Sequence, residues 1–396
     1  MPAPEPTVGA PRARVVGLDV LRLLAIGLVL GRHMWIPPGD SPAGVRALFA
    51  LWHRGGWIGV DLFFVLSGFL VSGLLFTEFR MHGRISPLRF YARRAWKIYP
   101  PYLVMIATTT VAILMQGYLI QRIQLLAELL FIQNYVKGLW LHTWSLAVEE
   151  HFYLVLPLVC LVALHAGRRR PATLRPLLLV GAAVAVGQLA LRIAYVSGGA
   201  PYEWEAHLYQ THLRLDSLFF GVMLSYCYHF HRPRFLRVLA PRRAMLLVVG
   251  SMLLAPAFVV PLETNPLMYT AGLTVIYMGS GMLVVGALSY DVQSSRVLGA
   301  LAAVGAFSYS IYLWHLPLLR LGIPTLERYA GAPFDFGART ALYLGGSVVL
   351  GMVMARLVEV PALRLRDRLY PSRAGRVSAP RPPRTIETPV GTAVVG

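Results

Sequence analysis

Residues 15–35 read VVGLDVLRLLAIGLVLGRHMW, an apolar run that contains Asp19, Arg22 and Arg32 and reaches His33 near its end. A bilayer crossing needs about 20 predominantly apolar residues, so this run is long enough to cross as one α-helix. It follows a polar start and lacks the small-residue cleavage site of a secretory signal peptide. We therefore predict a retained transmembrane helix.

The rest of the chain repeats this pattern. Of the 396 residues, 56% are hydrophobic and only 14% are charged. Such a composition excludes a soluble enzyme, a disordered chain and a fibrous repeat, and predicts an all-α polytopic membrane protein of the cell membrane. About ten transmembrane helices are expected, over residues 15–35, 57–79, 100–118, 145–166, 174–196, 211–230, 243–262, 269–289, 298–321 and 338–360.

The basic residues predict the orientation. The net charge is +19, but the basic side chains form short clusters between apolar runs rather than one amphipathic face, so no nucleic-acid partner is expected. If the N-terminus is cytoplasmic, the cytoplasmic loops and tail hold about 25 of the 37 Lys and Arg residues, and the opposite loops about six. By the positive-inside rule, both termini face the cytoplasm.

Three segments follow from this topology. Residues 1–14 form a cytoplasmic segment, 15–360 a transmembrane domain, and 361–396 a cytoplasmic tail. The tail is expected to be mostly disordered, because residues 371–396 are rich in Arg, Pro and Thr without apolar periodicity. Residues 123–132 are apolar but too short to cross, which predicts an interfacial or re-entrant helix, with an eleventh span as the alternative.

Ionisable side chains within the spans are the informative ones, because each costs several kcal/mol in a bilayer and usually lines a functional cavity. Arg22 and His33 lie only about 20° apart around their helix and roughly 16 Å apart along it, so they share one face at two depths. Other spans place polar groups at a depth similar to that of His33, which predicts one shared polar pocket: Asp61, Glu149, Glu150, Arg214, Asp216 and His315.

The chemistry favoured for such a pocket is general-base catalysis. A histidine with a near-neutral pKa can take a proton from a hydroxyl group, and a nearby carboxylate can fix its tautomer. No His-Glu-x-x-His or comparable spacing occurs, so no metal is expected. Ser67 and Ser145 lie outside any Gly-x-Ser-x-Gly turn, and we expect them to form hydrogen bonds between helices rather than act as nucleophiles.

A second feature is the basic cluster of Arg93, Arg94 and Lys97 beside Trp96 and Tyr99. Cations next to aromatic rings suit phosphates joined to an aromatic base, as in an acyl-CoA. Topogenic charge or anionic lipid binding would give the same pattern.

Seven motifs make the chain similar to a known family. In order they are GLDVLR at 17–22 with His33, GWIGVDLFFVLSGF at 56–69, RRAWKIYP at 93–100, WSLAVEEHFY at 144–153, RLD at 214–216 with Gly221, FSYSIYLWHLP at 307–317, and VEVP at 358–361. Their ordered combination resembles the bacterial integral-membrane acyltransferase 3 family over nearly the whole chain.

This resemblance implies O-acylation, often O-acetylation, in which cytoplasmic acyl-CoA donates to a hydroxyl of a carbohydrate, lipid-linked glycan or natural product. Acyl-CoA would be a co-substrate, and no permanently bound cofactor is implied. The resemblance makes His33 the catalytic residue, supported by Glu149, Glu150 and His315. It assigns the donor to Arg22, Arg93, Arg94 and Lys97, and gives supporting roles to Asp19, Asp61, Ser67, Arg214 and Asp216.

Two positions depart from the family pattern: Lys97 stands where Arg is usual, and His151 where Gln is common. Lys keeps the charge but loses the bidentate phosphate fork of Arg. Many relatives carry an extracytoplasmic hydrolase-like domain, and no room for one is expected here. A transporter or flippase remains an alternative, because buried charges also bind cargo during alternating access, and so does a non-catalytic scaffold.

Overall fold

The computed structural model describes residues 15–166, 175–199, 201–288 and 296–371, and within them every regular element is a helix. The α-helices are α1 (Val16–His33), α2 (Ala43–Gly55), α3 (Ile58–His82), α4 (Pro87–Met115), α5 (Arg122–Leu129), α6 (Trp144–Ala166), α7 (Pro176–Ser197), α8 (Leu215–Phe230), α9 (Arg232–Leu239), α10 (Arg243–Leu254), α11 (Pro256–Val259), α12 (Leu273–Leu288), α13 (Arg296–Gly305), α14 (Ser308–Pro317), α15 (Ile323–Ala330), α16 (Phe336–Met354) and α17 (Val360–Leu369).

Short 3-10 or π-helical turns join several of these helices: η1 (Leu141–Thr143), η3 (Glu205–Tyr209), η4 (Thr211–Leu213), η5 (Ala240–Arg242), η6 (Met268–Gly272), η7 (Leu318–Gly322) and η8 (Ala355–Glu359). The motif around His315, residues 307–317, is therefore followed directly by a widened π-helical turn, η7. Such turns are frequent at functional sites.

Seven helices of the described chain are long and apolar enough to cross a membrane, and an eighth span is possible where α13 and α14–α15 meet at a 57° bend. The multi-pass architecture is thus confirmed at this coarser level. The spans expected at residues 15–35 and 211–230 are not among those eight. The first corresponds to α1, which carries three charged residues, and the second to α8, which has only 16 residues and is short for a crossing. The count of about ten and the orientation of the termini stay predictions.

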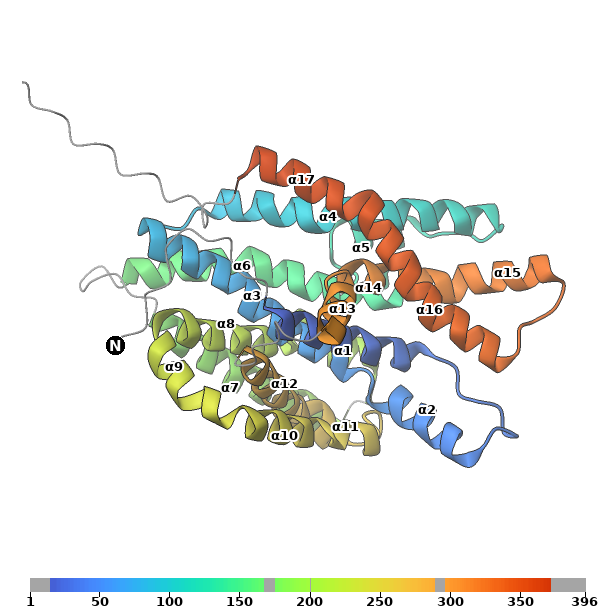
Figure 1. Cartoon of the computed structure of the whole chain (residues 1–396), viewed down its shortest axis with the longest axis horizontal. Helices are drawn as coiled ribbons and strands as arrows, with labels where there is room; N and C mark the ends of the chain where they lie inside the picture. Colours follow the sequence, from blue (N-terminus) through green and yellow to red (C-terminus); the bar gives the residue numbers. More distant parts are fainter. Residues whose placement is uncertain (1–14, 167–174, 200, 289–295, 372–396) are drawn as a thin grey trace, which may run out of the picture.

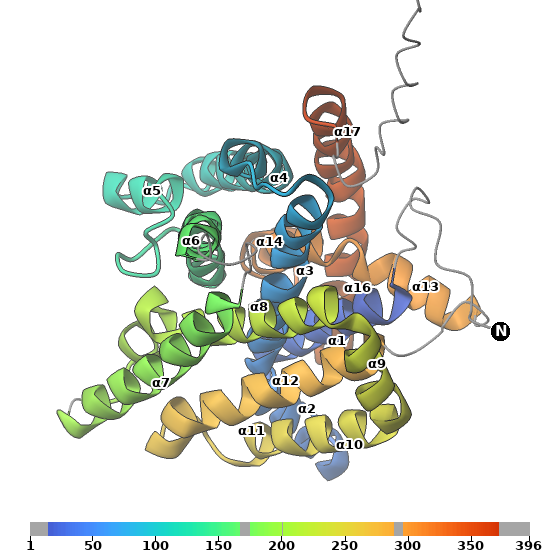
Figure 2. The same cartoon turned by 90° about the vertical axis from the view of Figure 1, so that its left-hand side faces the viewer.

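Helix α3 lies at the centre of the bundle, with α1 beside it and α8 and α12 on neighbouring sides (Figure 2). In an apolar 18-residue stretch of α3, 72% of the residues are buried inside the protein. The corresponding stretch of residues 232–259, which includes α10, is only 17% buried. Gly68 on α3 and Gly221 on α8 let these two backbones meet, because a Cβ on Gly68 would lie 2.0 Å from the carbonyl oxygen of Leu218.

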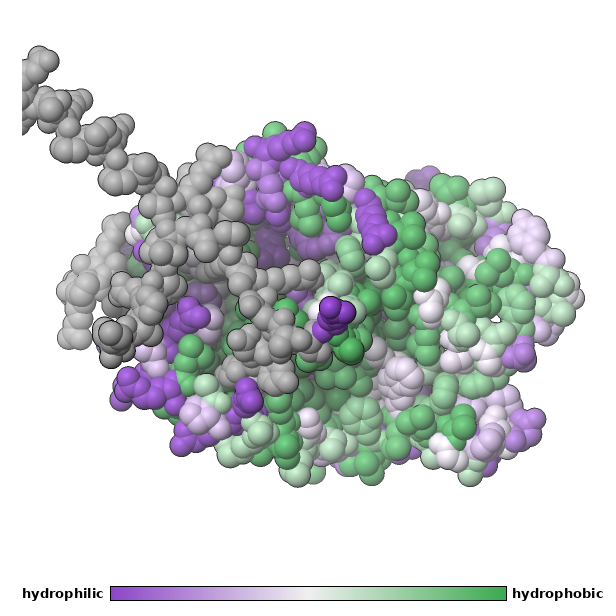
Figure 3. Space-filling view, viewed as in Figure 1, coloured by the Kyte–Doolittle hydropathy of each residue, from purple (hydrophilic) through white to green (hydrophobic). Residues whose placement is uncertain are grey.

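The long helices run roughly along the longest axis, with α2 and α15 at one end and α9 at the other (Figure 1). Hydrophobic residues cover the middle of the visible face, and hydrophilic residues gather toward the ends and along α17 (Figure 3). This distribution suits a protein surrounded by lipid at its middle.

The structure also locates two segments of the expected topology. Residues 123–132 include the short helix α5, which packs beside α4 and α6 rather than crossing the bundle (Figure 2). The expected tail begins at residue 361, but the chain continues as α17 to Leu369, where Arg93 on α4 pairs with Asp367 at 3.1 Å. Residues 1–14 and 372–396 lie outside the described chain.

Candidate active site

One cavity has a volume of about 690 Å³ and lies toward the α2–α15 end of the bundle. We call it the His33 cavity. Four tryptophans and four arginines contribute to its wall: Trp35, Trp57, Trp144, Trp204, Arg32, Arg214, Arg320 and Arg339. His33 itself comes from the last turn of α1 and is half-buried, so its ring is accessible from the cavity.

Three histidines from separate segments meet at this wall. The ring centroids of His33 and His315 are 5.2 Å apart, and those of His315 and His142 are 5.0 Å apart. His315 and His142 are fully buried behind His33. Sequence motifs predicted His33 and His315, and the structure brings them together.

Backbone carbonyls fix the tautomers of the two buried rings. His315 Nδ1 donates to the carbonyl oxygen of Tyr312 at 2.5 Å, and His142 Nε2 donates to that of Leu313 at 3.2 Å. A carbonyl oxygen can only accept, so each neutral ring is left with an unprotonated nitrogen. Within the described chain, His315 Nε2 and His142 Nδ1 have no hydrogen-bond partner. Both nitrogens are therefore available as acceptors.

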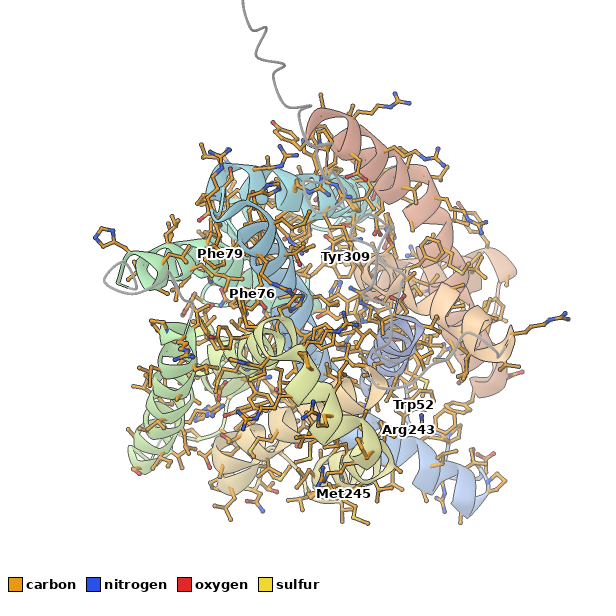
Figure 4. All side chains as sticks on the ribbon, turned by 60° about the vertical axis from the view of Figure 1, so that its left-hand side comes forward. Trp52, Phe76, Phe79, Arg243, Met245 and Tyr309 are labelled. Carbon is orange, nitrogen blue, oxygen red and sulfur yellow. The ribbon has the colours of Figure 1, made fainter. Side chains whose placement is uncertain are left out.

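A second, narrower cavity of about 160 Å³ lies deeper along the bundle, and we call it the Arg94 cavity. Its polar wall residues come from α1, α3, α4, α6 and α14: Arg22, Ser67, Arg94, Lys97, Ser145, Glu149, Glu150, Tyr153, Ser308, Tyr309 and Tyr312. Tyr309 lies in the interior of the bundle (Figure 4), where its hydroxyl donates to the carbonyl oxygen of Ile98 at 2.8 Å.

The cations of this second cavity differ in their partners. Arg22 pairs with Asp19 at 2.9 Å, and Lys97 pairs with the buried Glu359. For Arg94 the described chain provides no ion pair; its guanidinium lies 5.3 Å from the centroid of the Tyr153 ring. Arg93, which the resemblance assigned to the donor, does not line the cavity, because it faces α17 and pairs with Asp367.

Val60 and Tyr312 line both cavities, so the two cavities adjoin each other there. The Tyr312 hydroxyl donates to the carbonyl oxygen of His142 at 2.7 Å and lies 2.6 Å from Ser145 Oγ. The hydroxyl of Tyr312 has one hydrogen, which it donates to the His142 carbonyl oxygen. In the hydrogen bond between the two hydroxyls, Ser145 Oγ is therefore the donor and the Tyr312 oxygen the acceptor. The junction is thus held by hydrogen bonds that also position His142.

The two serines form hydrogen bonds between helices, as expected from the sequence. Ser67 on α3 lies 2.6 Å from the Tyr153 hydroxyl, which donates to Glu149 Oε2 at 2.8 Å, and Ser145 on α6 contacts Tyr312 on α14. Among the described residues, neither serine forms a hydrogen bond with a histidine ring; Ser145 reaches only the backbone carbonyl of His142, at 3.4 Å.

The single polar pocket predicted from the sequence is divided in the structure. Glu149 and Glu150 line the Arg94 cavity, whereas His33 lines the His33 cavity. The expectation of one pocket was wrong because similar depth along helices does not fix the direction in which side chains point. Consequently, among the described residues, the ring of His315 rather than Glu149 or Glu150 lies beside His33.

Two other predicted acids are committed to buried ion pairs. Asp61 accepts from Arg214 at 2.7 Å, and Asp216 accepts from Arg192 at 2.6 Å. All four side chains are at most 2% exposed. Arg214 lines the His33 cavity, but Asp216 lines neither cavity and ties α8 to α7.

Sequence reasoning missed His142 and His53. His142 lies between the expected spans, and its only signal is the adjacent WSLAVEEHFY motif. His53 is on α2, which docks on α1 through a hydrogen bond of 3.0 Å from Trp52 Nε1 (labelled in Figure 4) to the Gly27 carbonyl oxygen. Burial and the neighbouring Arg32 guanidinium lower the pKa of His53 from its ordinary value, so its ring is neutral at pH 7.

The geometry defines a class of protein: a helical membrane protein with two adjoining internal cavities. Arg22, Arg94 and Lys97 line one cavity, and His33 lines the other. Residues 15–356 match the model of the acyltransferase 3 family, described as an acyltransferase domain. The chain belongs to this family.

Two curated relatives are similar over most of this chain. The peptidoglycan O-acetyltransferase OatA of Listeria monocytogenes is 28% identical over 88% of this chain and 56% of its own length. The O-acetyltransferase OatA of Staphylococcus aureus is 27% identical over 76% of this chain and 50% of its own length. The chain thus spans about half the length of these relatives. No solved structure matches it.

Proposed function

We propose that this chain is a membrane O-acyltransferase that moves an acyl group, acetyl in the simplest case, from acyl-CoA to a glycan hydroxyl, with His33 as general base. The observation that carries the proposal is that the two cavities adjoin each other at Val60 and Tyr312, which line both. One offers cations to a phosphorylated donor and the other offers a base to a hydroxyl acceptor. The names of the relatives support acetyl as the group and a glycan as the acceptor.

The donor would enter through the Arg94 cavity. Its volume of about 160 Å³ suits a slender acyl-pantetheine arm better than a whole nucleotide. The adenine nucleotide would therefore stay outside, near the basic start of α4, with Arg22, Arg94 and Lys97 at the entrance of the arm. The thioester would reach the junction at Tyr312.

The acceptor would bind in the His33 cavity. His33 takes the hydroxyl proton, the hydroxyl oxygen bonds to the thioester carbon, and the carbon–sulfur bond breaks to release CoA. His315 would act through His33. Ring centroids 5.2 Å apart allow an N–H of His33 to donate to the unpartnered Nε2 of His315, which leaves the other His33 nitrogen as the base.

The test measures CoA release from acetyl-CoA by the purified protein with a panel of hydroxyl acceptors. His33→Ala is compared with His231→Ala, because His231 is exposed between α8 and α9 and lines neither cavity. We expect acceptor-dependent release to fall by about 10²–10⁴-fold in His33→Ala and to persist in His231→Ala.

Folding of both variants is checked by size-exclusion chromatography. Equal release by wild type and a folded His33→Ala would remove His33 from the chemistry. Acceptor movement across vesicles without CoA release would instead establish the transporter alternative.

A further inference from the structure

The charges of the His33 cavity do not balance. Three of its four arginines have a carboxylate partner: Arg32 pairs with Glu263 at 3.2 Å, Arg214 with Asp61 at 2.7 Å, and Arg339 with Glu327 at 2.5 Å. For Arg320, the fourth, the structure records neither an ion pair nor a hydrogen bond with any described residue, and its side chain is exposed at the cavity. One positive charge is left over.

Arg320 is also placed close to the candidate chemistry. It lies on the π-helical turn η7, five residues after His315 on the continuous α14–η7 segment. Its neighbours Leu319 and Ile323 line the same wall, which fixes the backbone of this turn against the cavity. A group bound by Arg320 would therefore lie near the base.

The aromatic side chains suit a sugar ring. Arg32 lies 4.6 Å from the centroid of the Trp204 ring, and Arg339 lies 5.7 Å from that of Trp35. Flat indole faces beside cations offer an apolar surface with charged edges, which fits a ring that has both C–H faces and polar substituents.

From these observations we infer that the acceptor is an anionic glycan, whose carboxylate or phosphate pairs with Arg320 while a neighbouring hydroxyl faces His33. This inference rests on the proposed function and deepens it by naming the charge of the acceptor. A negatively charged group compensates the unpaired guanidinium of Arg320, which is exposed at the cavity. A neutral glycan would leave Arg320 unpaired.

The experiment uses three acceptors that share one pyranose: N-acetylglucosamine, which is neutral; N-acetylmuramic acid, which adds a carboxylate; and N-acetylglucosamine 1-phosphate. Binding to the full-length protein in nanodiscs is followed by tryptophan fluorescence, since four tryptophans line the cavity. Acetyl transfer is measured in parallel.

We expect both anionic sugars to bind about tenfold or more tighter than the neutral one, as a charge-assisted hydrogen bond allows. Arg320→Gln should abolish this difference and Arg320→Lys should retain most of it. Arg328→Gln is the matched control, because Arg328 is also exposed and eight residues away but lies outside the cavity, where it donates to Gln116 at 3.1 Å.

The two arms separate this inference from the proposed function. Three results would overturn the anionic acceptor: the neutral and anionic sugars bind equally, none of the sugars binds, or Arg320→Gln weakens the binding of both classes to the same extent. A preference for only one of the anionic sugars identifies carboxylate or phosphate as its source. Arg320-dependent binding of anionic sugars without transfer to any of them supports the binding site and counts against the acyltransferase.

Discussion

Arg93 and Arg94 are neighbours in the sequence, but they face different parts of the molecule. Arg94 lines the Arg94 cavity without a described ion-pair partner, and Arg93 pairs with Asp367 on α17. If the cavity receives the donor, only Arg94 should contribute to its binding. We expect Arg94→Gln to raise the KM for acyl-CoA about 10-fold or more, and Arg93→Gln to change it by less than about threefold.

Steady-state kinetics at saturating acceptor measure both constants. An equal rise in KM for the two variants would mean that the donor recognises the whole basic cluster electrostatically, and the distinction between the two arginines would be lost.

Arg192 and Asp216 form a buried ion pair, and neither residue lines a candidate cavity. The pair is 2.6 Å long, and each side chain is 2% exposed. Removing one partner of such a pair leaves an uncompensated charge, which costs about 3–5 kcal/mol, whereas replacing both by apolar groups can be neutral. We therefore expect Asp216→Ala to lower the thermal unfolding temperature strongly.

The double variant Arg192→Met with Asp216→Leu should recover most of the loss, as measured by unfolding in detergent. A double variant as unstable as Asp216→Ala would show that the pair contributes more than mutual neutralisation.

Helices α3 and α8 meet at glycines, and this contact sets the position of the central helix. A Cβ on Gly68 would lie 2.0 Å from the carbonyl oxygen of Leu218, and one on Gly221 would lie 2.3 Å from that of Val65. Backbone atoms cannot move aside cheaply, so Gly68→Ala should separate the two helices and cost about 1–3 kcal/mol.

Gly187→Ala is the control, since on α7 an added Cβ meets nothing within 4 Å. Thermal unfolding in detergent compares the two, and equal stability of both variants would contradict the close contact of α3 with α8.

Element by element, hydropathy was a good guide to where helices lie, because an apolar run about 20 residues long has few alternatives in a bilayer. It was a poorer guide to helix ends and breaks. Residues 298–321 were expected as one span, but the structure bends by 57° between α13 and α14. The expected tail also includes α17, whose contact with α4 depends on tertiary pairing that no local pattern shows.

At the site, sequence motifs singled out His33, His315 and three cations of the Arg94 cavity, but not the division of these residues between two cavities. The direction of each side chain depends on how α1, α4, α6 and α14 rotate and pack, and depth alone does not contain that information. His142 was missed for a related reason: it lies in the loop that Glu128 holds. The carboxylate of Glu128 accepts from the Trp140 backbone N–H at 2.8 Å and from the Thr143 hydroxyl at 3.1 Å.

For the whole molecule, the decisive property is which side of the membrane each cavity faces. The Arg94 cavity lies toward the start of α4, and the His33 cavity lies toward α2 and α15 at the other end of the bundle (Figure 1). The distribution of basic residues predicts that the α4 start is cytoplasmic. In that case donor and acceptor would approach the junction at Tyr312 from opposite sides, and the acceptor would be extracytoplasmic.

Single cysteines test this arrangement. In a background with Cys160→Ala and Cys227→Ala, Asp40→Cys marks the α2 end and Arg84→Cys the start of α4; both positions are exposed. A membrane-impermeant maleimide added to intact cells should label Asp40→Cys at once and Arg84→Cys only after permeabilisation, because thiol reaction requires access. The reverse pattern would place the His33 cavity on the cytoplasmic side. An acceptor made inside the cell would then meet the base directly, and the donor would have to come from outside, where acyl-CoA is absent, so the proposed route of the donor would fail.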